Sequence, residues 1–186
     1  KRNEKNYKKN YKNYRDYFKS NLGNMGNMKE KRITITIQEY LPDELQKNDQ
    51  HLITMATNAA KDAYAPYSSF RVGAALQLDN GKIITANNQE NAAFPSGMCA
   101  ERIAMFYANA LYPGVAIITL AITAMKDGKQ LDSAVYPCGA CRQALLESEV
   151  RHNKDIRIIM AGKKKVEIAP SVSALLPLHF TSTFLK

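Results

Sequence analysis

The chain has 186 residues, of which 45% are hydrophobic, and this is enough for one sizeable core but too little for two ordinary domains. Its formal net charge of +9 is concentrated in residues 1–27, which hold eight Lys or Arg against two acidic residues. The remaining residues carry little net charge, so the composition does not favour a nucleic-acid partner. No segment approaches the roughly 18 apolar residues of a membrane span, and the N-terminus lacks the apolar run of a secretory signal. We therefore expect a cytoplasmic protein with no membrane partner.

Residues 1–27 consist mainly of Lys, Asn, Tyr and Arg, with few aliphatic side chains. Burial of so little apolar surface does not offset the entropy that ordering would cost. We interpret this segment as a low-complexity basic tail, disordered or non-native. A single folded domain is expected over residues 28–186.

Apolar periodicity predicts the elements of the first half of this domain. Residues 33–38 (ITITIQ) are typical of a short strand, and residues 47–63 of an amphipathic helix. Residues 70–78 then predict a strand, which a turn at Asn80-Gly81 connects to a partner strand over residues 82–86.

The second half of the domain alternates helices with buried strands. Helices are predicted over residues 99–110 and 138–148, and strands over residues 115–124, 156–161 and 166–168. This alternation indicates an α/β fold in which helices cover both faces of a sheet.

The three cysteines are the first sign of chemistry. A disulfide framework accounts for them poorly, because their number is odd, Cys138 and Cys141 form a C-x-x-C, and no secretion signal precedes them. Metal binding or redox chemistry fits them better. Cys99 and the C-x-x-C each lie at the start of a predicted helix, and Pro137 supports the second start. The partial positive charge of a helix N-terminus favours the thiolate form that metals bind.

Three thiolates around one metal leave a tetrahedral position open for water, which distinguishes a catalytic from a structural zinc site. Glu101 lies two residues beyond Cys99, within reach of that water, and a carboxylate there can act as general acid and base. Arg102, and also Arg142, could donate hydrogen bonds to the sulfurs and offset their charge.

The pattern C-x-E followed by P-C-x-x-C is the signature of zinc-dependent nucleobase deaminases. Its three-cysteine form lies here among YSSFRVGAA, NQENAAFP and LLP, at residues 67–75, 88–95 and 175–177. In this respect the chain resembles the small homotetrameric cytidine deaminases, from about residue 48 to residue 180. The resemblance implies a three-layer α/β/α sandwich with a central mixed five-stranded sheet.

The resemblance also implies a reaction. One Zn²⁺ per subunit, held by Cys99, Cys138 and Cys141, would activate a water that attacks C4 of the pyrimidine, with Glu101 as the proton shuttle. The expected activity is hydrolysis of cytidine and deoxycytidine to uridine and deoxyuridine in pyrimidine salvage. Arg102 is expected to support the thiolates from outside the ligand set.

The resemblance further assigns the substrate contacts. Asn88 and Glu90 match a pair that binds the ribose 3′-hydroxyl, and Phe70 matches an aromatic residue beside the base. Ala100 matches a residue whose backbone binds the base carbonyl. Phe180 matches an aromatic residue that stacks on the base in a neighbouring subunit, so the resemblance implies a homotetramer with shared sites.

Two positions depart from the family pattern. Ala86-Asn87 stands where the family often has Gly-Cys, and Phe94 replaces a frequent Tyr. Neither position carries the metal or the proton shuttle, so these changes affect the expected substrate fit more than the expected activity.

Structural explanations remain open for these residues. The cysteines could form a structural zinc knuckle or be buried thiols, Asn88 and Glu90 could cap a loop, and both phenylalanines could be core residues. Another cytosine compound, such as a blasticidin-type antibiotic, would suit a similar metal site. RNA binding or editing through the basic tail is a second alternative. The three histidines are scattered, and we assign them no metal role.

Overall fold

The structure is a computed structural model that describes residues 29–185. The chain divides after Thr34, and the unit that begins at Ile35 holds all the helices and strands described below. The predicted tail, residues 1–27, lies outside the described residues, so its character stays a prediction. Within the described part of the chain, no helix has the length and apolar character needed to cross a membrane.

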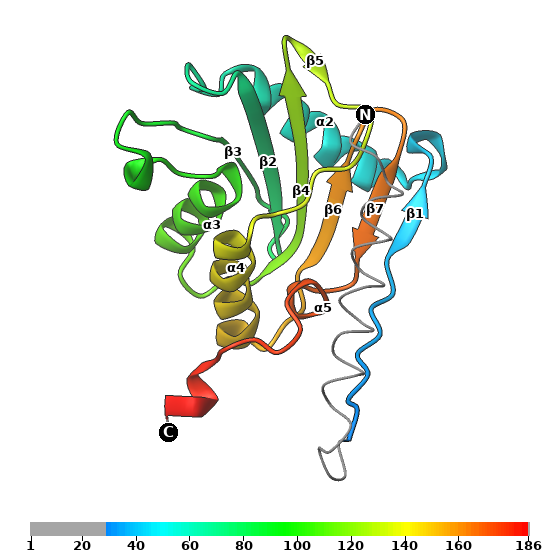
Figure 1. The fold of residues 1–186 in the computed structure, drawn as a ribbon, viewed down its shortest axis with the longest axis vertical. Coiled ribbons are helices and arrows are strands. Elements are labelled where there is room, and N and C mark those ends of the chain that lie inside the picture. The colour runs from blue at the N-terminus through cyan, green and yellow to red at the C-terminus, as the bar shows by residue number, and fades with distance from the viewer. Residues whose placement is uncertain (1–28, 186) are drawn as a thin grey trace, which may run out of the picture. The chain divides into compact units, whose positions relative to one another are not determined.

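Seven strands and four α-helices make up this unit (Figure 1). In chain order they are β1 (Gln38–Tyr40), α2 (Lys47–Lys61), β2 (Phe70–Leu78), β3 (Ile83–Asn87), α3 (Ala100–Leu111), β4 (Ile117–Lys126), β5 (Lys129–Gln130), α4 (Gly139–His152), β6 (Arg157–Ala161), β7 (Val166–Ala169) and α5 (Val172–Leu175). Short 3₁₀ turns lie at Pro42–Glu44, Phe94–Ser96 and Ser182–Leu185.

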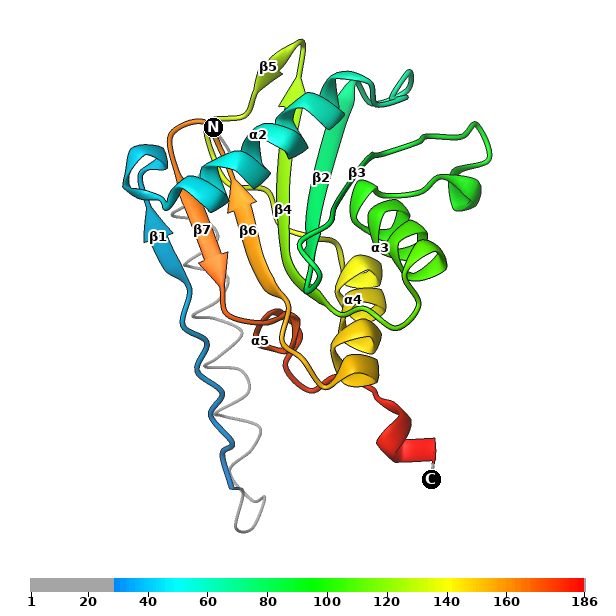
Figure 2. The ribbon, with the colours of Figure 1, turned by 180° about the vertical axis from the view of Figure 1, so that it is seen from behind.

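The strands form one mixed sheet in the order β1-β7-β6-β4-β2-β3, and β5 pairs with the end of β4. Only β4 and β6 pair in parallel, and α4 is the crossover that such a pair requires. Helix α2 covers one face of the sheet, whereas α3 and α4 cover the other, as the two opposite views show (Figures 1 and 2). The predicted α/β/α sandwich is therefore confirmed.

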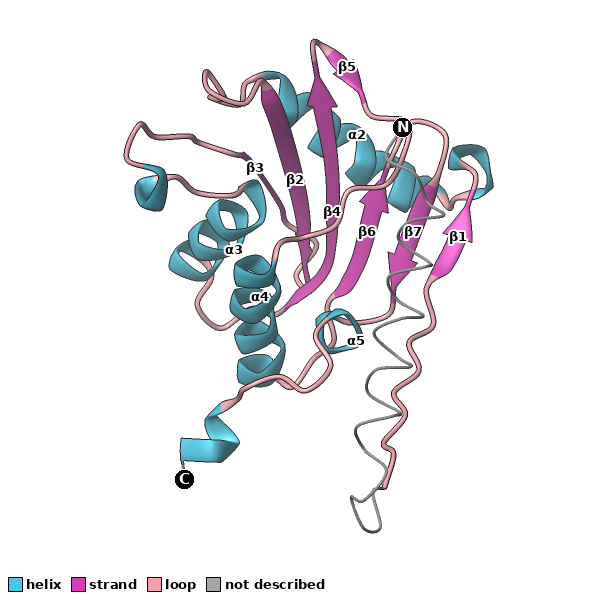
Figure 3. Cartoon of the chain, in the orientation of Figure 1, coloured by secondary structure: helices cyan, strands magenta, loops and turns pink. Residues whose placement is uncertain are grey.

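Five of the strands expected from the sequence are neighbours in this sheet, from β7 to the edge strand β3 (Figure 3). The predicted number of five corresponds to β2, β3, β4, β6 and β7, and the short β1 and β5 bring the total to seven. The expected hairpin is present, because Gly81 has a φ of 80° and the backbone N–H of Leu78 donates to Lys82 O at 2.8 Å.

The prediction of a strand over residues 33–38 was largely wrong. Only Gln38 of that range is in β1, whose three residues pair with β7. The partner strand stops at Ala169, which lies opposite Ile37 in this register, and Pro170 follows, so nothing in β7 remains for residues 33–36 to pair with. The alternating Ile and Thr residues have strand propensity but lack a partner strand, and Ile35 is exposed.

Two apolar clusters hold the layers together, one on each face of the sheet. Successive strand residues point to opposite faces, so Ala121 of β4 packs toward α2, whereas Leu120 and Ile122 pack toward α3 and α4. Ile158 and Ile159 of β6 divide between the two clusters in the same way. Both faces of the sheet are thus buried, as the continuous apolar runs of β4 and β6 predict.

Gly73 lets α2 lie directly against β2. A Cβ atom at this position would stand 1.9 Å from the carbonyl oxygen of Ala56 and 2.6 Å from the backbone nitrogen of Ala60. Both contacts are with helix backbone, which cannot move aside without displacing α2. The small residues on either side of this contact therefore fix how closely the helix approaches the strand that carries Phe70 and Val72.

A buried carboxylate fastens α4 to two other segments. Glu149 accepts backbone hydrogen bonds from Ile156 at 2.8 Å, from Val172 at 2.6 Å and from Ser173 at 3.1 Å. These donors precede β6 and begin α5. Burial raises the pKa of Glu149 despite the three N–H groups that favour its charged form.

We expect Glu149→Ala to lower the free energy of unfolding by about 3 kcal/mol, because it leaves buried N–H groups without an acceptor. Glu147→Ala is the matched control, since Glu147 is exposed on the same helix and should change stability by less than about 0.5 kcal/mol. Urea denaturation of both variants tests this expectation, and equal losses in the two would contradict it.

Candidate active site

Two helix N-termini meet over the face of the sheet that α3 and α4 cover, and they bring the three cysteines together. Cys99 is the N-cap residue of α3, Cys138 is the N-cap of α4, and Cys141 lies in the first turn of α4. The sulfur of Cys138 lies 3.9 Å from that of Cys99 and 3.4 Å from that of Cys141. The positive ends of both helix dipoles therefore point at one sulfur cluster.

The donor set fits a zinc ion. All three sulfurs lie within 4.8 Å of one another. Cysteine thiolates are soft ligands that bind zinc readily. Hydrogen bonding from the Cys141 thiol, assisted by Arg102, lowers the pKa of Cys99 to about 5, although burial opposes this. The same hydrogen bond raises the pKa of Cys141, so of these two thiols Cys99 is the first to become a thiolate.

Arg102 is the cation beside this cluster. Burial disfavours its charge, but hydrogen bonding and attraction to Cys99 and Cys141 raise its pKa. Its Nε is buried and has no hydrogen-bond partner among the described residues. The side chain thus lies where it could offset part of the negative charge of the sulfurs, and that role stays a prediction.

Arg142, the second arginine considered for that role, serves another purpose. Its Nε donates to the carbonyl of Pro137 at 2.9 Å, and its Nη1 donates to the carbonyl of Leu175 at 2.8 Å. These bonds direct the guanidinium toward backbone carbonyls, so it braces the chain on either side of α4.

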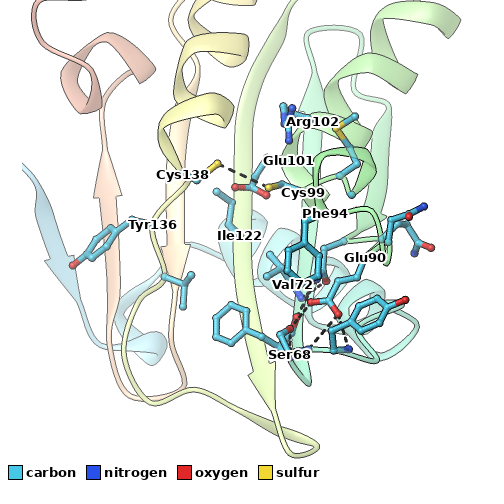
Figure 4. Close-up of a pocket in the computed structure, with 18 residues that line it drawn as sticks. Ser68, Val72, Glu90, Phe94, Cys99, Glu101, Arg102, Ile122, Tyr136 and Cys138 are labelled. Carbon is cyan, nitrogen blue, oxygen red and sulfur yellow. Dashed lines mark hydrogen bonds between the residues drawn. The ribbon is translucent and has the colours of Figure 1, made fainter.

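Glu101 lies beside the sulfurs with its carboxylate inside the fold. Only 4% of the residue is exposed, and burial is the main reason that its pKa is raised, with the negative charge of Cys99 adding to the effect. Figure 4 shows its carboxylate near Cys99 and Cys138 at one end of a pocket. A carboxyl group whose pKa is raised in this way holds a proton more readily than a carboxyl group in water, as a proton carrier must.

The pocket has a volume of about 640 Å³. Cys99, Cys138 and Glu101 line one end, and Phe70, Asn88 and Glu90 also contribute to its wall. Glu90 and Ser68 lie at the opposite end from the sulfurs (Figure 4). With Arg102, which also lines the pocket, seven of the residues expected at the site are therefore brought to one cavity from four separate segments of the chain.

The side chains of Asn88 and Glu90 make hydrogen bonds to the start of β2 and to the two residues 67–68 that precede it. Asn88 accepts from Val72 N at 2.7 Å and donates to Phe70 O at 3.0 Å. Glu90 Oε2 accepts from Tyr67 N at 2.9 Å and from Ser68 N at 3.3 Å, and Oε1 accepts from the Ser68 hydroxyl. The hydrogen bond from the Ser68 hydroxyl is the main reason that the pKa of Glu90 is lowered. Both residues thus stabilise the loop, and both face the pocket.

Ala100 and Phe180 lie elsewhere. Ala100 is fully buried at the start of α3, next to Cys99 and Glu101, and is not among the residues that line the pocket. Phe180 is also absent from the pocket, is 56% exposed, and stacks on Phe184 with ring centroids 5.6 Å apart. The substrate contacts expected of these two residues stay predictions.

The loop that leads to Cys138 is pinned to the turn between β6 and β7. The backbone N–H groups of Lys163 and Lys164 donate to the carbonyls of Leu131 and Asp132, at 2.8 and 3.1 Å. A Cβ atom on Gly162 would lie 2.4 Å from the carbonyl carbon of Ser133. The absence of a side chain at Gly162 therefore lets this loop run against the turn.

The loop between β3 and α3 is held in a similar way. Gln89 and Met98 exchange backbone hydrogen bonds of 2.9 Å, and Glu90 N donates to Tyr64 O at 2.8 Å. These bridges close the loop at its base, so Glu90 and Cys99 both line the pocket although nine positions separate them in sequence.

Sequence reasoning missed several residues of this wall, notably Tyr67, Ser68 and Tyr136. Ser68 lies in the YSSF segment, but nothing in the spacing shows that its hydroxyl reaches Glu90. Phe94, noted only as a departure from the family pattern, is 76% exposed and meets Tyr67 edge to face, with centroids 6.2 Å apart. These residues come together only through loop folding.

Comparison with known proteins agrees with this geometry. Residues 46–154 match the family model of the cytidine and deoxycytidylate deaminase zinc-binding region, and this range contains all three cysteines. The chain belongs to this family. The cysteine cluster is therefore the zinc site of a family member, with one Zn²⁺ per chain.

Individual relatives cover most of the domain. A cytidine deaminase of Halalkalibacterium halodurans is 40% identical over 72% of this chain and 94% of its own length. One from Sporosarcina psychrophila is 42% identical over 74% of this chain and 94% of its own length. The crystal structure of a cytidine deaminase from Burkholderia pseudomallei superposes with a TM-score of 0.62 at 34% identity, over 73% of this chain and 100% of that one.

Because metal binding adds to folding stability, removal of zinc should lower the melting temperature by at least about 10 °C and abolish activity at the same time. Cys141→Ser provides the matched variant: a chelator should lower the melting temperature of the wild type and leave that of the variant nearly unchanged. Calorimetry with zinc analysis of each sample measures this. An unchanged melting temperature in a wild-type sample verified to be free of zinc would contradict the assignment.

Proposed function

We propose that this chain hydrolyses cytidine and deoxycytidine to uridine and deoxyuridine, with release of ammonia. The observation that carries the proposal is the buried Glu101 carboxylate beside three converging thiols at the end of a pocket. Family membership and the names of the relatives, all of them cytidine deaminases, support the substrate class. Conversion of one pyrimidine nucleoside into another suits a role in cytoplasmic pyrimidine salvage.

Cys99, Cys138 and Cys141 would hold the metal, and Arg102 would moderate the charge of the thiolates. When bound, Zn²⁺ lowers the pKa of a coordinated water and so supplies hydroxide near neutral pH. In the reaction, a C4–O bond forms, the C4–N bond breaks, and the amino group leaves as ammonia.

Glu101 moves the protons of this reaction. Its carboxylate takes a proton from the attacking water and delivers it to N3 of the cytosine ring. It then takes the remaining proton from the new hydroxyl group on C4 and delivers it to the amino group, which leaves as ammonia. The raised pKa that burial gives this group supports such a role, because a proton carrier works best when its pKa lies near the working pH. Burial also keeps bulk water from competing for the same proton.

The base would lie between Phe70 and the start of α3. Phe70 lines the pocket, and Ala100 occupies the first position of α3, where backbone N–H groups lack helical partners. We assign Ala100 to the base carbonyl through its backbone, and Phe70 to the face or edge of the ring.

Asn88 has one hydrogen-bond donor, and Glu90 one acceptor site, that can bind the sugar. The side-chain nitrogen of Asn88 uses one hydrogen for Phe70 O, so a second hydrogen remains. Three protein donors occupy Glu90, and one lone-pair site of its four remains on Oε1. A hydroxyl both accepts and donates, so the ribose 3′-hydroxyl satisfies both groups. Ribose and deoxyribose share this hydroxyl, which supports turnover of both nucleosides.

Phe180 would act in the site of a neighbouring subunit. Its exposure and its absence from the pocket of its own chain support this assignment. The assignment requires an oligomer, and we propose the homotetramer with shared active sites that the family resemblance implies.

Wild-type protein mixed with cytidine should lower the absorbance of the cytidine band, whereas Glu101→Ala should fail to do so while it still contains zinc. The reason is that the variant keeps all three ligands but loses the proton carrier. Turnover by Glu101→Ala at the wild-type rate would refute the role of Glu101. No turnover by either protein, with zinc present, would direct the search to another cytosine-bearing substrate.

Glu90→Gln should reduce kcat/KM for cytidine about 100-fold, because the amide loses charge and opposes the N–H donors that now bind the carboxylate. Glu147→Gln, at an exposed position of α4, should leave kcat/KM within about twofold. Steady-state kinetics at matched zinc content decides the matter, and an unaffected rate in Glu90→Gln would eliminate the sugar contact.

A further inference from the structure

Ser68 links the pocket wall to Glu90 through two hydrogen bonds. Its hydroxyl donates to Oε1 of Glu90 and accepts from the backbone N–H of Phe70 at 3.0 Å. Ser68 also lines the pocket, and Figure 4 shows it next to Glu90. The hydroxyl therefore connects the backbone at the start of β2 to one oxygen of a carboxylate that faces the cavity.

The two oxygens of Glu90 are held differently. Oε2 accepts from two backbone donors, Tyr67 N and Ser68 N, and so anchors the turn before β2. Among the described residues, Oε1 has the Ser68 hydroxyl as its sole hydrogen-bond donor. A carboxylate that is anchored through one oxygen can still rotate about its side-chain torsion, whose energy profile is broad. A donor on the second oxygen fixes the plane of the group.

We propose that Ser68 is a positioning residue that fixes the Glu90 carboxylate plane, so that the free lone pair of Oε1 points at the sugar hydroxyl of the substrate. This inference rests on the proposed contact of Glu90 with the 3′-hydroxyl. The same hydrogen bond is the largest influence that lowers the pKa of Glu90, which keeps the acceptor ionised.

The geometry separates this role from a general role in stability. In Ser68→Ala the two backbone donors to Oε2 remain, so the turn keeps its anchor on Glu90. The Phe70 N–H loses its acceptor at an exposed position, where water can replace it. Ser68→Ala should therefore mainly alter the orientation of Oε1 of Glu90.

The test compares cytidine with 3′-deoxycytidine, which lacks the hydroxyl that Glu90 would bind. Ser68→Ala should reduce kcat/KM for cytidine about tenfold and change that for 3′-deoxycytidine by less than about twofold. Ser68→Thr, which keeps a hydroxyl, should restore most of the loss. Ser96→Ala is the matched control, because Ser96 is exposed in a nearby 3₁₀ turn and does not line the pocket.

Equal losses on both substrates, or no loss on cytidine, would overturn the role of Ser68. Glu90→Gln run in the same series separates this failure from a failure of the sugar contact itself. If Glu90→Gln affects both substrates equally, the contact of Glu90 with the 3′-hydroxyl is wrong, and the role of Ser68 falls with it. Lack of cytidine turnover by the wild type would instead refute the proposed function before any variant is compared.

Discussion

The meeting of two helix N-termini is the constraint on which the rest of the site depends. Three thiolates repel one another, and they can share one small volume only where positive charge compensates them. The Zn²⁺ of this site is the largest such charge. The N-terminal ends of α3 and α4 point at the same cluster, and the guanidinium of Arg102 is placed to add to them. The parallel pairing of β4 with β6 requires the crossover helix α4, and this topology places the C-x-x-C beside Cys99.

Loops that carry functional residues are held by backbone contacts at their bases. Backbone hydrogen bonds join the turn between β6 and β7 to the segment before Cys138. The absence of a side chain at Gly162 makes that close approach possible. The bridges of Gln89 with Met98 perform the same task for the loop that joins Glu90 to Cys99. A pocket built on loops therefore gains rigidity from the sheet to which the loops are tied.

The two glutamates that line the pocket have the same side chain, but their environments shift their pKa values in opposite directions. Glu90 accepts several hydrogen bonds near solvent, and its pKa is lowered, so it stays an acceptor. Glu101 is buried, and its pKa is raised, so it can exchange a proton. Desolvation dominates for the second group, and hydrogen bonding for the first. The proposed roles, sugar binding and proton transfer, follow this division.

The sequence by itself determined the C-x-E and C-x-x-C motifs that contain the cysteines and Glu101, the long helices and the hairpin at Gly81, because each depends on local spacing, capping or turn chemistry. It misplaced the first strand, since pairing depends on where β7 ends at Ala169 rather than on the propensity of residues 33–37. Only the tertiary structure decided that Arg142 binds carbonyls, that Glu149 fastens α4, and that Ser68 reaches Glu90. These contacts join residues that are distant in sequence or depend on the direction of a side chain in a loop, and periodicity carries no information about either.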